Sequence, residues 1–321
     1  MVLALLLSAP LVLGFLKTVH PAFDSFAHFR AHLAVLLALA SLPLLFFRPW
    51  RAQGLLAFAL AGAALTTVFD PTGLRLDSNA AEPARPAAIY RLLHLNLRYD
   101  NSTPKKVLSL IGRSDADVVT LNEVSGMWVD QLAFTGQAYP YRLICPHRAR
   151  TGGVAILSRR PFLHSSRANC HDRGSLAVAT INFSGTAVDI VALHLAWPWP
   201  FEQAWQIGSV TPVLERLGST AVLAGDFNAA PWSNTAQRLA EAGGFWMLRN
   251  IGPTWLKLPL PHWLRRIAGL PIDNIFVKGL VEPLATKRLE TVGSDHLPVL
   301  LEFSLRPKPA TPEALQASLG E

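Results

Sequence analysis

Carboxylates, amides and histidines stand beside short apolar runs throughout the chain beyond residue 89. They are Asn96, Glu123, His194, the motif Gly225-Asp226-Phe227-Asn228, the pair Ile272-Asp273 and the motif Ser294-Asp295-His296. The apolar runs that precede them are Leu92–Leu95, Val118–Leu121, Val188–Leu193 and Thr220–Ala224, and the run Asn274–Val277 follows Asp273. We expect these runs to be strands whose polar ends gather along one edge of a packed sheet. Carboxylates, amides and two histidines in one place suit metal-assisted chemistry on phosphate groups.

Hydrolysis of a phosphate ester makes three demands on such a site. It needs a hard cation on the phosphoryl oxygens, a base for the attacking water, and donors for the charge that develops in the transition state. Mg²⁺ needs few protein carboxylates because it keeps several of its own waters. Glu123 directly follows an apolar run, where a solvated surface glutamate would usually follow alternating polar residues. It is therefore the candidate metal ligand, whereas Asn96 and Asp226 taken singly also fit ordinary turns.

The order and spacing of these motifs resemble the endonuclease/exonuclease/phosphatase superfamily, which includes pancreatic-type DNases, AP endonucleases, sphingomyelinases and inositol polyphosphate 5-phosphatases. The resemblance covers about residues 89–305. It implies an α+β, DNase-like fold in four layers, with a two-sheet β-sandwich flanked by helices. Runs that are apolar on both faces indicate strands covered on both sides, and helices are predicted between them at Pro104–Arg113 and Phe201–Leu217. Both patterns fit the implied fold.

The resemblance also implies a role for each site residue, with Mg²⁺ or Mn²⁺ as the cofactor. The metal group is Glu123, Asn96 and Asp295, and the catalytic group is His194, Asp226, Asn228, Asp273 and His296. Asp226 is expected to orient or deprotonate the attacking water, and Asn228 to donate to the phosphate. A carboxylate such as Asp273 beside His296 keeps the imidazole charged at neutral pH. His194 departs from the DNase pattern because the sequence shows no obvious acidic partner for it.

The N-terminal part of the chain is far more apolar than an ordinary soluble enzyme. Half of all 321 residues are hydrophobic, only 16% are charged, and the mean hydropathy is +0.28. The excess lies in residues 1–70, which we predict to be an all-α transmembrane anchor with three spans at about 1–19, 31–47 and 52–69. Each span is close to the lower limit of about 17 residues. The segments show no polar face of the kind expected for core helices of a soluble domain.

The remaining boundaries follow from composition. Residues 71–88 are rich in Pro, Ala and small polar residues and are predicted to be a linker. Residues 89–305 form the predicted catalytic domain. Residues 306–321 contain three prolines and scattered charge, and we expect a disordered tail there.

The sequence gives opposing indications of the side of the membrane on which the domain lies. Positive-inside counting slightly favours a cytoplasmic domain, with Arg48 and Arg51 on one side against Lys17, Arg30, Arg75 and Arg85 on the other. Cys145 and Cys170 are either a disulfide of an oxidising compartment or two unrelated thiols. Membrane members of the superfamily, including a group associated with glycopeptide-antibiotic resistance, generally carry the domain outside the cytoplasm. The resemblance thus implies a multi-pass cell-membrane protein with an extracytoplasmic catalytic domain.

The substrate is the least determined feature of the sequence. The net charge of +7 attracts polyanions, which include nucleic acid and anionic lipid surfaces. The segment Thr254–Leu270 combines Trp255 and Trp263 with basic residues, so it is either a lid that dips into lipid or a loop packed on the sandwich. We expect a membrane-anchored phosphoesterase acting on a lipid-linked or small phosphorylated substrate. The alternatives are a metal-dependent endo- or exonuclease and a non-catalytic binding module.

Overall fold

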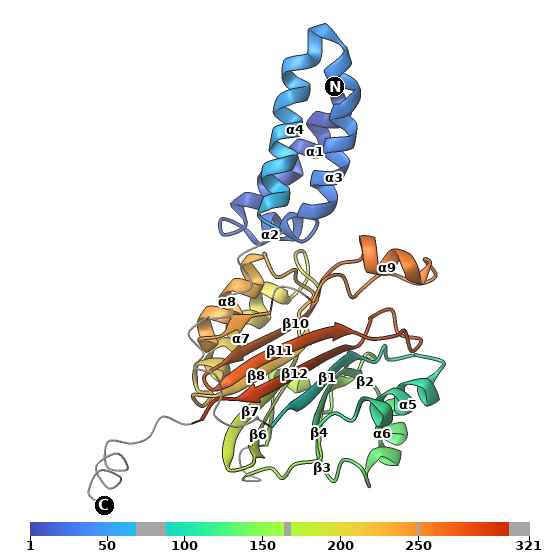
Figure 1. Ribbon diagram of the computed structural model, residues 1–321, viewed down its shortest axis with the longest axis vertical. Coiled ribbons are helices and arrows are strands. Elements are labelled where there is room, and N and C mark those ends of the chain that lie inside the picture. Colours follow the sequence, from blue (N-terminus) through green and yellow to red (C-terminus); the bar gives the residue numbers. More distant parts are fainter. Residues whose placement is uncertain (69–87, 164–167, 249–250, 308–321) are drawn as a thin grey trace, which may run out of the picture.

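The computed structural model describes residues 1–68, 88–163, 168–248 and 251–307. Most of the predicted linker (71–88) and tail (306–321) lies outside these described residues. Two six-stranded mixed sheets pack face to face in the part of the chain after residue 89, here called the sandwich (Figure 1). The first sheet has the order β11 (Val281–Arg288), β12 (Val299–Leu305), β1 (Tyr90–Asn96), β2 (Val118–Val124), β4 (Gly153–Ser158), β3 (Tyr141–Ile144). The second has the order β5 (Asn169–His171), β6 (Leu176–Phe183), β7 (Thr186–His194), β8 (Ala221–Asp226), β10 (Asp273–Lys278), β9 (Trp246–Met247).

Helices cover the outer faces of both sheets. Helices α5 (Pro104–Ser114) and α6 (Gly126–Leu132) pack on the first sheet, and α7 (Gln203–Glu215) and α8 (Asn234–Gly243) pack on the second. A separate apolar core fills the space between the sheets, with Leu92 and Val222 on opposite sides of it. The predicted arrangement of two sheets flanked by helices is therefore confirmed.

The strands agree with the apolar runs of the sequence but extend further at their polar ends. β1, β7 and β8 each include the polar residue that follows the run, namely Asn96, His194 and Asp226. The predicted helix at Phe201–Leu217 is shorter, at Gln203–Glu215. The site residues thus belong to the regular ladders, and strand pairing fixes their positions.

A disulfide joins the two sheets. Cys145 directly follows β3 and Cys170 lies in β5, and these are the outermost strands of their sheets. Their Cα atoms are 5.5 Å apart. Of the two alternatives that the sequence left open, the structure contains the disulfide.

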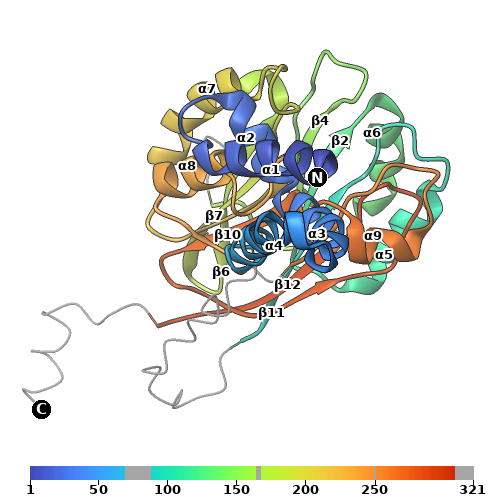
Figure 2. The same cartoon turned by 90° about the horizontal axis from the view of Figure 1, so that it is seen from above.

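The N-terminal residues form a compact group of helices above the sandwich (Figures 1 and 2). Helices α1 (Val2–Leu13), α3 (Arg30–Ser41) and α4 (Arg51–Thr66) run alongside one another and are here called the helical bundle. Helix α2 (Pro21–His28) lies across the base of the bundle, where it faces the sandwich. The chain bends by 117° between the segment Val2–Leu16 and α2.

Within the described residues, no single helix has both the length and the apolar character needed to cross a membrane. The segments Val2–Leu16 and Pro21–His28 are long and apolar enough only when they are taken together across the bend. Arg30–Phe46 is apolar but shorter. The bundle buries alanines together with Leu11 and Leu37, and it also exposes many large apolar residues. Ala34, Ala61 and Ala64 are fully buried, whereas Leu6 and Leu56 are 66% and 73% exposed.

Candidate active site

Strand register brings the predicted site residues together at one edge of the sandwich. His194 and Asp226 are partners at the ends of the parallel strands β7 and β8. Asp226 also pairs with Asp273, the first residue of the antiparallel strand β10. In the first sheet, the parallel strands β1 and β2 pair Asn96 with Asn122. Both sheets therefore contribute polar strand ends to the same site.

Glu123 reaches this site through an irregularity in strand pairing. β2 pairs regularly with β4 up to Leu121, and the register shifts before the next pair at Val124. Glu123 has a φ of 57°, in the left-handed region that non-glycine residues seldom adopt. β-Bulges beside active sites redirect side chains in this way. The Glu123 carboxylate accepts hydrogen bonds from Asn96 Nδ2 at 3.1 Å and from the Tyr99 backbone N–H at 2.8 Å.

Asn96 connects the two carboxylates of Glu123 and Asp226. Its Nδ2 donates to Glu123 Oε1 at 3.1 Å and to Asp226 Oδ2 at 3.0 Å, and its Oδ1 accepts from the Arg98 backbone N–H at 2.9 Å. The residue is fully buried. Burial raises the pKa of Glu123, and the hydrogen bonds from the Tyr99 N–H and from Asn96 oppose that shift. In this geometry Asn96 holds the carboxylates at a fixed separation.

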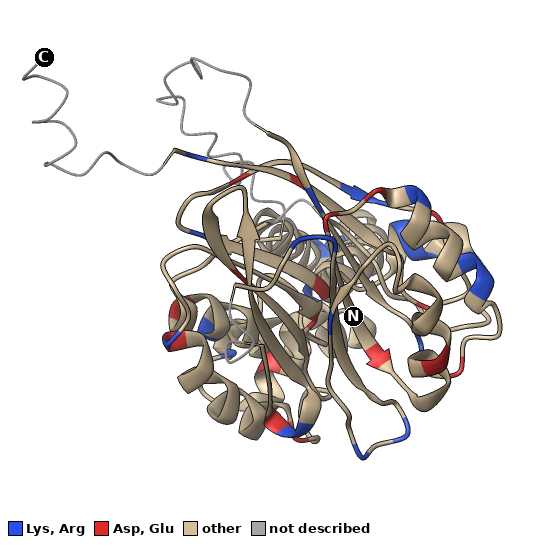
Figure 3. Ribbon diagram, turned by 90° about the horizontal axis from the view of Figure 1, so that it is seen from below, with Lys and Arg blue, Asp and Glu red and all other residues tan. Residues whose placement is uncertain are grey.

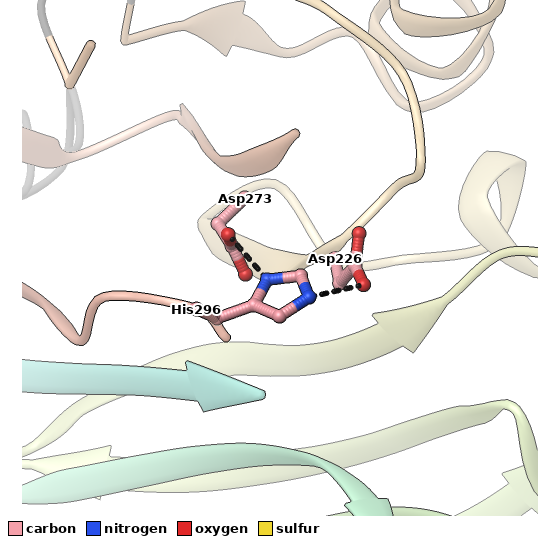
Figure 4. Close-up of side chains that lie close together, drawn as sticks. All are labelled: Asp226, Asp273 and His296. Atoms are coloured by element: carbon pink, nitrogen blue, oxygen red, sulfur yellow. Dashed lines mark hydrogen bonds and ion pairs between the residues drawn. The ribbon is translucent and has the colours of Figure 1, made fainter. Parts of the chain in front are cut away.

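Asp226 lies beside both histidines of the site, and Figure 4 shows His296 between it and Asp273. Its Oδ2 is 3.5 Å from His296 Nε2 and 3.7 Å from His194 Nε2. Burial raises the pKa of Asp226 to about 7, although the positive charge of His296 opposes that rise. Only 2% of the residue is exposed, so its interactions are determined by the side chains that surround it.

The motif Gly225-Asp226-Phe227-Asn228 is shaped by close backbone approaches. A Cβ atom at Gly225 would collide with the carbonyl oxygen of Leu193, so glycine allows β8 to lie against β7. Asn228 has a φ of 46°, which Asn tolerates better than most residues. Its Nδ2 donates to the Leu195 carbonyl at 2.8 Å, and its backbone N–H donates to Asp226 Oδ1 at 2.9 Å. The backbone around β7 therefore fixes Asn228 in place.

Asp273 and His296 form a buried ion pair, with 2.8 Å between Asp273 Oδ2 and His296 Nδ1 (Figure 4). Burial alone would lower the pKa of His296, but the carboxylates of Asp273 and Asp226 outweigh it and raise that pKa to about 10. Burial alone would raise the pKa of Asp273, and the charge and hydrogen bond of His296 instead bring it well below its usual range. The structure thus brings the predicted pair together with the imidazole charged near neutral pH.

His194 is in a different electrostatic state. Its side chain is 17% exposed, more than that of Asp226 or His296. Burial, followed by the positive charge of His296, lowers its pKa to about 4, so it is neutral near pH 7. The sequence offered no obvious acidic partner for His194, and in the structure its Nε2 lies 3.7 Å from Asp226 Oδ2.

Asp295 is hydrogen-bonded to the Thr254–Leu270 segment. Its Oδ2 accepts a hydrogen bond from Trp255 Nε1 at 3.1 Å. The Trp255 ring packs edge-on against Trp197 with 5.5 Å between the ring centroids. Trp263, on helix α9 (His262–Ala268), is instead 65% exposed. Trp255 packs at the site, as expected for a loop packed on the sandwich. Trp263 projects outward, as expected for a lid that contacts lipid.

The donor set fits a hard divalent cation at Glu123. Buried Asp226, Asp273 and His296 lie within 4.8 Å of one another, but both ring nitrogens of His296 face carboxylates. A charged imidazole in that position has no lone pair for an ion. The carboxylate of Glu123 is partly exposed and supplies the oxygen ligand that Mg²⁺ and Mn²⁺ prefer. Glu123, with Asn96 beside it, is the residue that would hold the ion.

Three buried residues contribute to the site although the sequence assigned them no role. His94 Nε2 lies 3.2 Å from Asp273 Oδ1, and Asn122 Oδ1 accepts from the Asp226 backbone N–H at 2.8 Å. Gln203, at the start of α7, contacts the motif that contains Asp226. His94 lies two residues before Asn96, and Asn122 lies directly before Glu123. A polar residue within or directly after an apolar strand run was therefore the sequence pattern that could have identified both. Gln203 had no comparable signal.

The chain belongs to the Endonuclease/Exonuclease/phosphatase family, whose model matches residues 93–296. The matched region contains every predicted site residue from Asn96 to His296. Members of this superfamily are hydrolases that act on phosphoester bonds. The family match therefore establishes the class of protein.

Two curated relatives align with part of the chain. UPF0294 protein VV2535 of Vibrio vulnificus (strain YJ016) is 32% identical over 119 residues, which cover 37% of this chain and 39% of that protein. UPF0294 protein VP2298 of Vibrio parahaemolyticus is 26% identical over 156 residues, 47% of this chain and 50% of that protein. The chain thus matches half or less of the length of these relatives.

Solved structures share the fold of the sandwich. A 3′ phosphatase from Neisseria bound to product DNA hairpin has a TM-score of 0.54 at 19% identity, covering 67% of this chain and 99% of that chain. An AP endonuclease from Archaeoglobus fulgidus has a TM-score of 0.52 at 17% identity with the same coverage. An endonuclease/exonuclease/phosphatase from Bacteroides vulgatus has a TM-score of 0.55 at 18% identity, covering 68% and 100%. At these identities the likeness establishes the fold alone.

Proposed function

We propose that this protein is a divalent-metal-dependent phosphoesterase that hydrolyses a phosphate ester or anhydride presented at a membrane surface. The observation that carries the hydrolytic part is the position of Asp226, whose Oδ2 lies between Asn96 and the charged His296. A carboxylate held there can accept the proton of an attacking water. The imidazolium of His296, fixed by Asp273, can stabilise negative charge on the phosphoryl oxygens.

The other side chains complete this reaction. Neutral His194 faces the same Asp226 oxygen from the partly exposed side, where it can donate to a bound phosphate. Mg²⁺ or Mn²⁺ held at Glu123 would neutralise charge on the phosphoryl group. These groups occupy one connected site, which disfavours a non-catalytic binding module, since a binding module would have no need of a base between two histidines.

The membrane part of the proposal rests on the large apolar side chains that the bundle exposes. A water-soluble helical bundle would turn its large apolar side chains inward. Here Ala34, Ala61 and Ala64 share the interior with Leu11 and Leu37, whereas many large apolar residues, Leu5, Leu6 and Leu56 among them at more than 60%, are exposed. Small residues between helices and large apolar residues outside are typical of helices packed in lipid. Helix α4, at 16 residues, is about 24 Å long, shorter than a hydrocarbon core of about 30 Å, so such a bundle requires local thinning of the bilayer.

Helix α9 supports a substrate that is linked to lipid. It lies near the base of the bundle (Figures 1 and 2), where His32 Nε2 of α3 contacts the Ala268 carbonyl oxygen at 2.9 Å. Trp263 and Ile267 on α9 are 65% and 73% exposed. Tryptophan at the level where apolar helices end is typical of a membrane interface. The segment that includes Trp255 at the site would thereby bring the site close to lipid headgroups.

We further propose that the sandwich lies outside the cytoplasm. The Cys145–Cys170 disulfide supports this placement, because disulfides persist in oxidising compartments. The resemblance to membrane members associated with glycopeptide resistance stays a prediction. Protease added to intact spheroplasts should cut the sandwich, and protection until lysis would place the sandwich in the cytoplasm.

A nuclease is the second candidate, supported by the net charge of +7 and by family members that act on nucleic acid. The side of the sandwich opposite the bundle shows basic and acidic segments interspersed (Figure 3). Duplex-binding surfaces more often present a continuous basic patch. That face lies away from the site, so the choice between the two candidates rests on the Thr254–Leu270 segment beside the site, whose packed Trp255 and exposed Trp263 favour a substrate at a membrane surface.

An activity panel separates the two candidates. Detergent-purified full chain with Mg²⁺ or Mn²⁺ would be assayed on plasmid DNA, phospholipid vesicles and polyprenyl pyrophosphates. We expect phosphate or headgroup release from the lipid substrates and little nicking of the plasmid. Faster cleavage of plasmid DNA than of any lipid would favour the nuclease instead.

A further inference from the structure

Helix α2 contacts the sandwich directly behind the Asp226 motif. The contacts involve the segment 230–235, which connects that motif to α8. The segment belongs to the same connection that begins with Asp226 and Asn228. A helix of the N-terminal region is therefore packed against the backbone that carries two predicted catalytic residues.

Asp24 of α2 caps the N-terminus of α8. Its Oδ1 accepts from the Asn234 backbone N–H at 2.7 Å, and its Oδ2 accepts from the Thr235 backbone N–H at 3.0 Å. The residue is 5% exposed. The first N–H groups of a helix have no partner within the helix, and a carboxylate there is also favoured by the helix dipole. A distant part of the chain thus supplies part of the cap of α8.

A second pair of contacts holds the residues before this cap. His28 Nδ1 accepts from the Ala230 backbone N–H at 3.1 Å. Trp232 Nε1 donates to the carbonyl of Ala27 at 2.7 Å. His28 is 2% exposed, so this contact is buried. Three residues of α2, Asp24, Ala27 and His28, therefore fix the connection between Ala230 and Thr235.

Gln203 extends this contact to the motif itself. The Thr235 hydroxyl lies 3.0 Å from both Asp24 Oδ2 and Gln203 Oε1. Gln203 Nε2 donates to the carbonyls of Phe227 and Asn228 at 3.1 and 3.2 Å. The Asn228 N–H in turn donates to Asp226 Oδ1 at 2.9 Å. A continuous chain of buried polar groups runs from Asp24 to Asp226.

We propose that α2 is a positioning element of the active site, in which Asp24 acts through Thr235 and Gln203 to hold the Asp226–Asn228 backbone. The N-terminal region then does more than attach the sandwich to lipid. Its helix α2 is part of the structure that sets the catalytic geometry, and the state of the bundle is coupled to turnover. The effect on turnover rests on the proposed function, whereas the effect on backbone order does not.

The test compares Asp24→Ala and Thr235→Val with the wild-type full chain in detergent. Asp189→Ala is the matched control, because Asp189 is a buried carboxylate on β7 that accepts from Thr180 Oγ1 and the Gly218 N–H and lies at the end of β7 remote from His194. Hydrogen exchange of backbone amides is measured first. Loss of the cap should speed exchange at Asn234 by about 5- to 30-fold and also speed exchange at Asn228.

Turnover is measured second. We expect Asp24→Ala to lower kcat by roughly 10-fold, because small displacements of catalytic groups are costly. The Mg²⁺ concentration for half-maximal activity should stay unchanged, since Glu123 is on another strand. Asp24→Asn, which keeps one acceptor oxygen, should recover part of the loss. Thr235→Val should give a smaller loss that is not additive with that of Asp24→Ala.

Two results would overturn the positioning role. One is unchanged exchange at Asn228 in both Asp24→Ala and Thr235→Val, and the other is a loss of kcat in Asp189→Ala equal to that in Asp24→Ala. Wild-type protein that hydrolyses no phosphate ester would refute the proposed function. In that case the exchange data alone would still decide whether α2 holds the motif.

Discussion

The sandwich and the N-terminal region differ in where their polar residues with a role at the site stand in the sequence. In the sandwich, polar residues stand at the ends of apolar strands, and register brings Asp226 together with His194 and Asp273. In the N-terminal region, apolar residues dominate the sequence, yet polar side chains such as those of Asp24 and His28 contact the sandwich. The comparison shows that a strongly apolar segment can contribute to a site through its few polar side chains.

The largest expected effect is at the strand-end site. Asp226→Asn should lower turnover by about 10²–10⁴-fold, because the amide cannot accept the proton of the attacking water. Binding of Mg²⁺ or Mn²⁺, measured by calorimetry, should stay intact. Asp189→Asn, at the other end of β7, serves as the control and should keep near-normal turnover. Near-normal turnover in Asp226→Asn would remove the proposed base.

Glu123→Gln should act on the metal instead of the proton transfer. We expect the affinity for Mg²⁺ to fall by at least about 10-fold, because loss of a residue that only hydrogen-bonds to a metal ligand already lowers metal affinity by that much. Turnover should recover in part at high Mg²⁺. If half-maximal activity requires the same Mg²⁺ concentration as in wild type, Glu123 does not hold the ion.

Removing residues 1–70 tests whether the N-terminal region is only an anchor. The sandwich has its own core and a disulfide, so we expect a folded, water-soluble domain that hydrolyses a soluble phosphodiester. Turnover should be roughly 10-fold below that of the full chain, because the contacts of α2 to the Asp226 connection are lost. Equal kcat values for the two forms would show that the N-terminal region serves only as an anchor. An insoluble product would show that residues 1–70 are part of the core on which the sandwich depends.

The smallest expected effect concerns helix α9. Replacing both Trp263 and Ile267 with Ser should reduce activity on vesicle-embedded phosphate by about fivefold, because interfacial burial of these side chains is lost. Activity on a soluble ester should not change. Trp246→Ser is the control, since Trp246 is 54% exposed but pairs with Val277, away from Asp273. Equal losses on both substrates would show that α9 serves the fold and not lipid contact.

Much of the sandwich could be predicted from the sequence because local patterns determine it. Apolar runs predicted the strands, and polar residues at their ends predicted which edge would carry the site. Asn96, Glu123, Asp226 and His296 could be chosen for this reason. The irregularity that directs Glu123 and the contact between Asp273 and His94 depend on pairing between distant strands. No local pattern in the sequence predicts them.

The N-terminal contacts could not be predicted because hydropathy averages over single residues. Asp24 and His28 stand within a stretch dominated by apolar residues, and their partners Asn234 and Ala230 lie more than 200 positions away in the sequence. The 117° bend lies between Leu16 and Pro21, at the end of the first predicted span, so α2 falls between the first two predicted spans, in a stretch for which no structure was predicted. Only the folded chain shows that α2 faces the sandwich.

The most direct test of the account is metal-dependent hydrolysis of a soluble phosphodiester by the full chain. Product release would be followed in Mg²⁺, after addition of EDTA, after restoring Mg²⁺, and with Asp226→Asn in place of wild type. We predict release that stops with EDTA, returns with Mg²⁺ and is nearly absent in Asp226→Asn. Release that continues in EDTA, or that is equally fast in Asp226→Asn, would contradict the assignment of this site as a metal-dependent phosphoesterase.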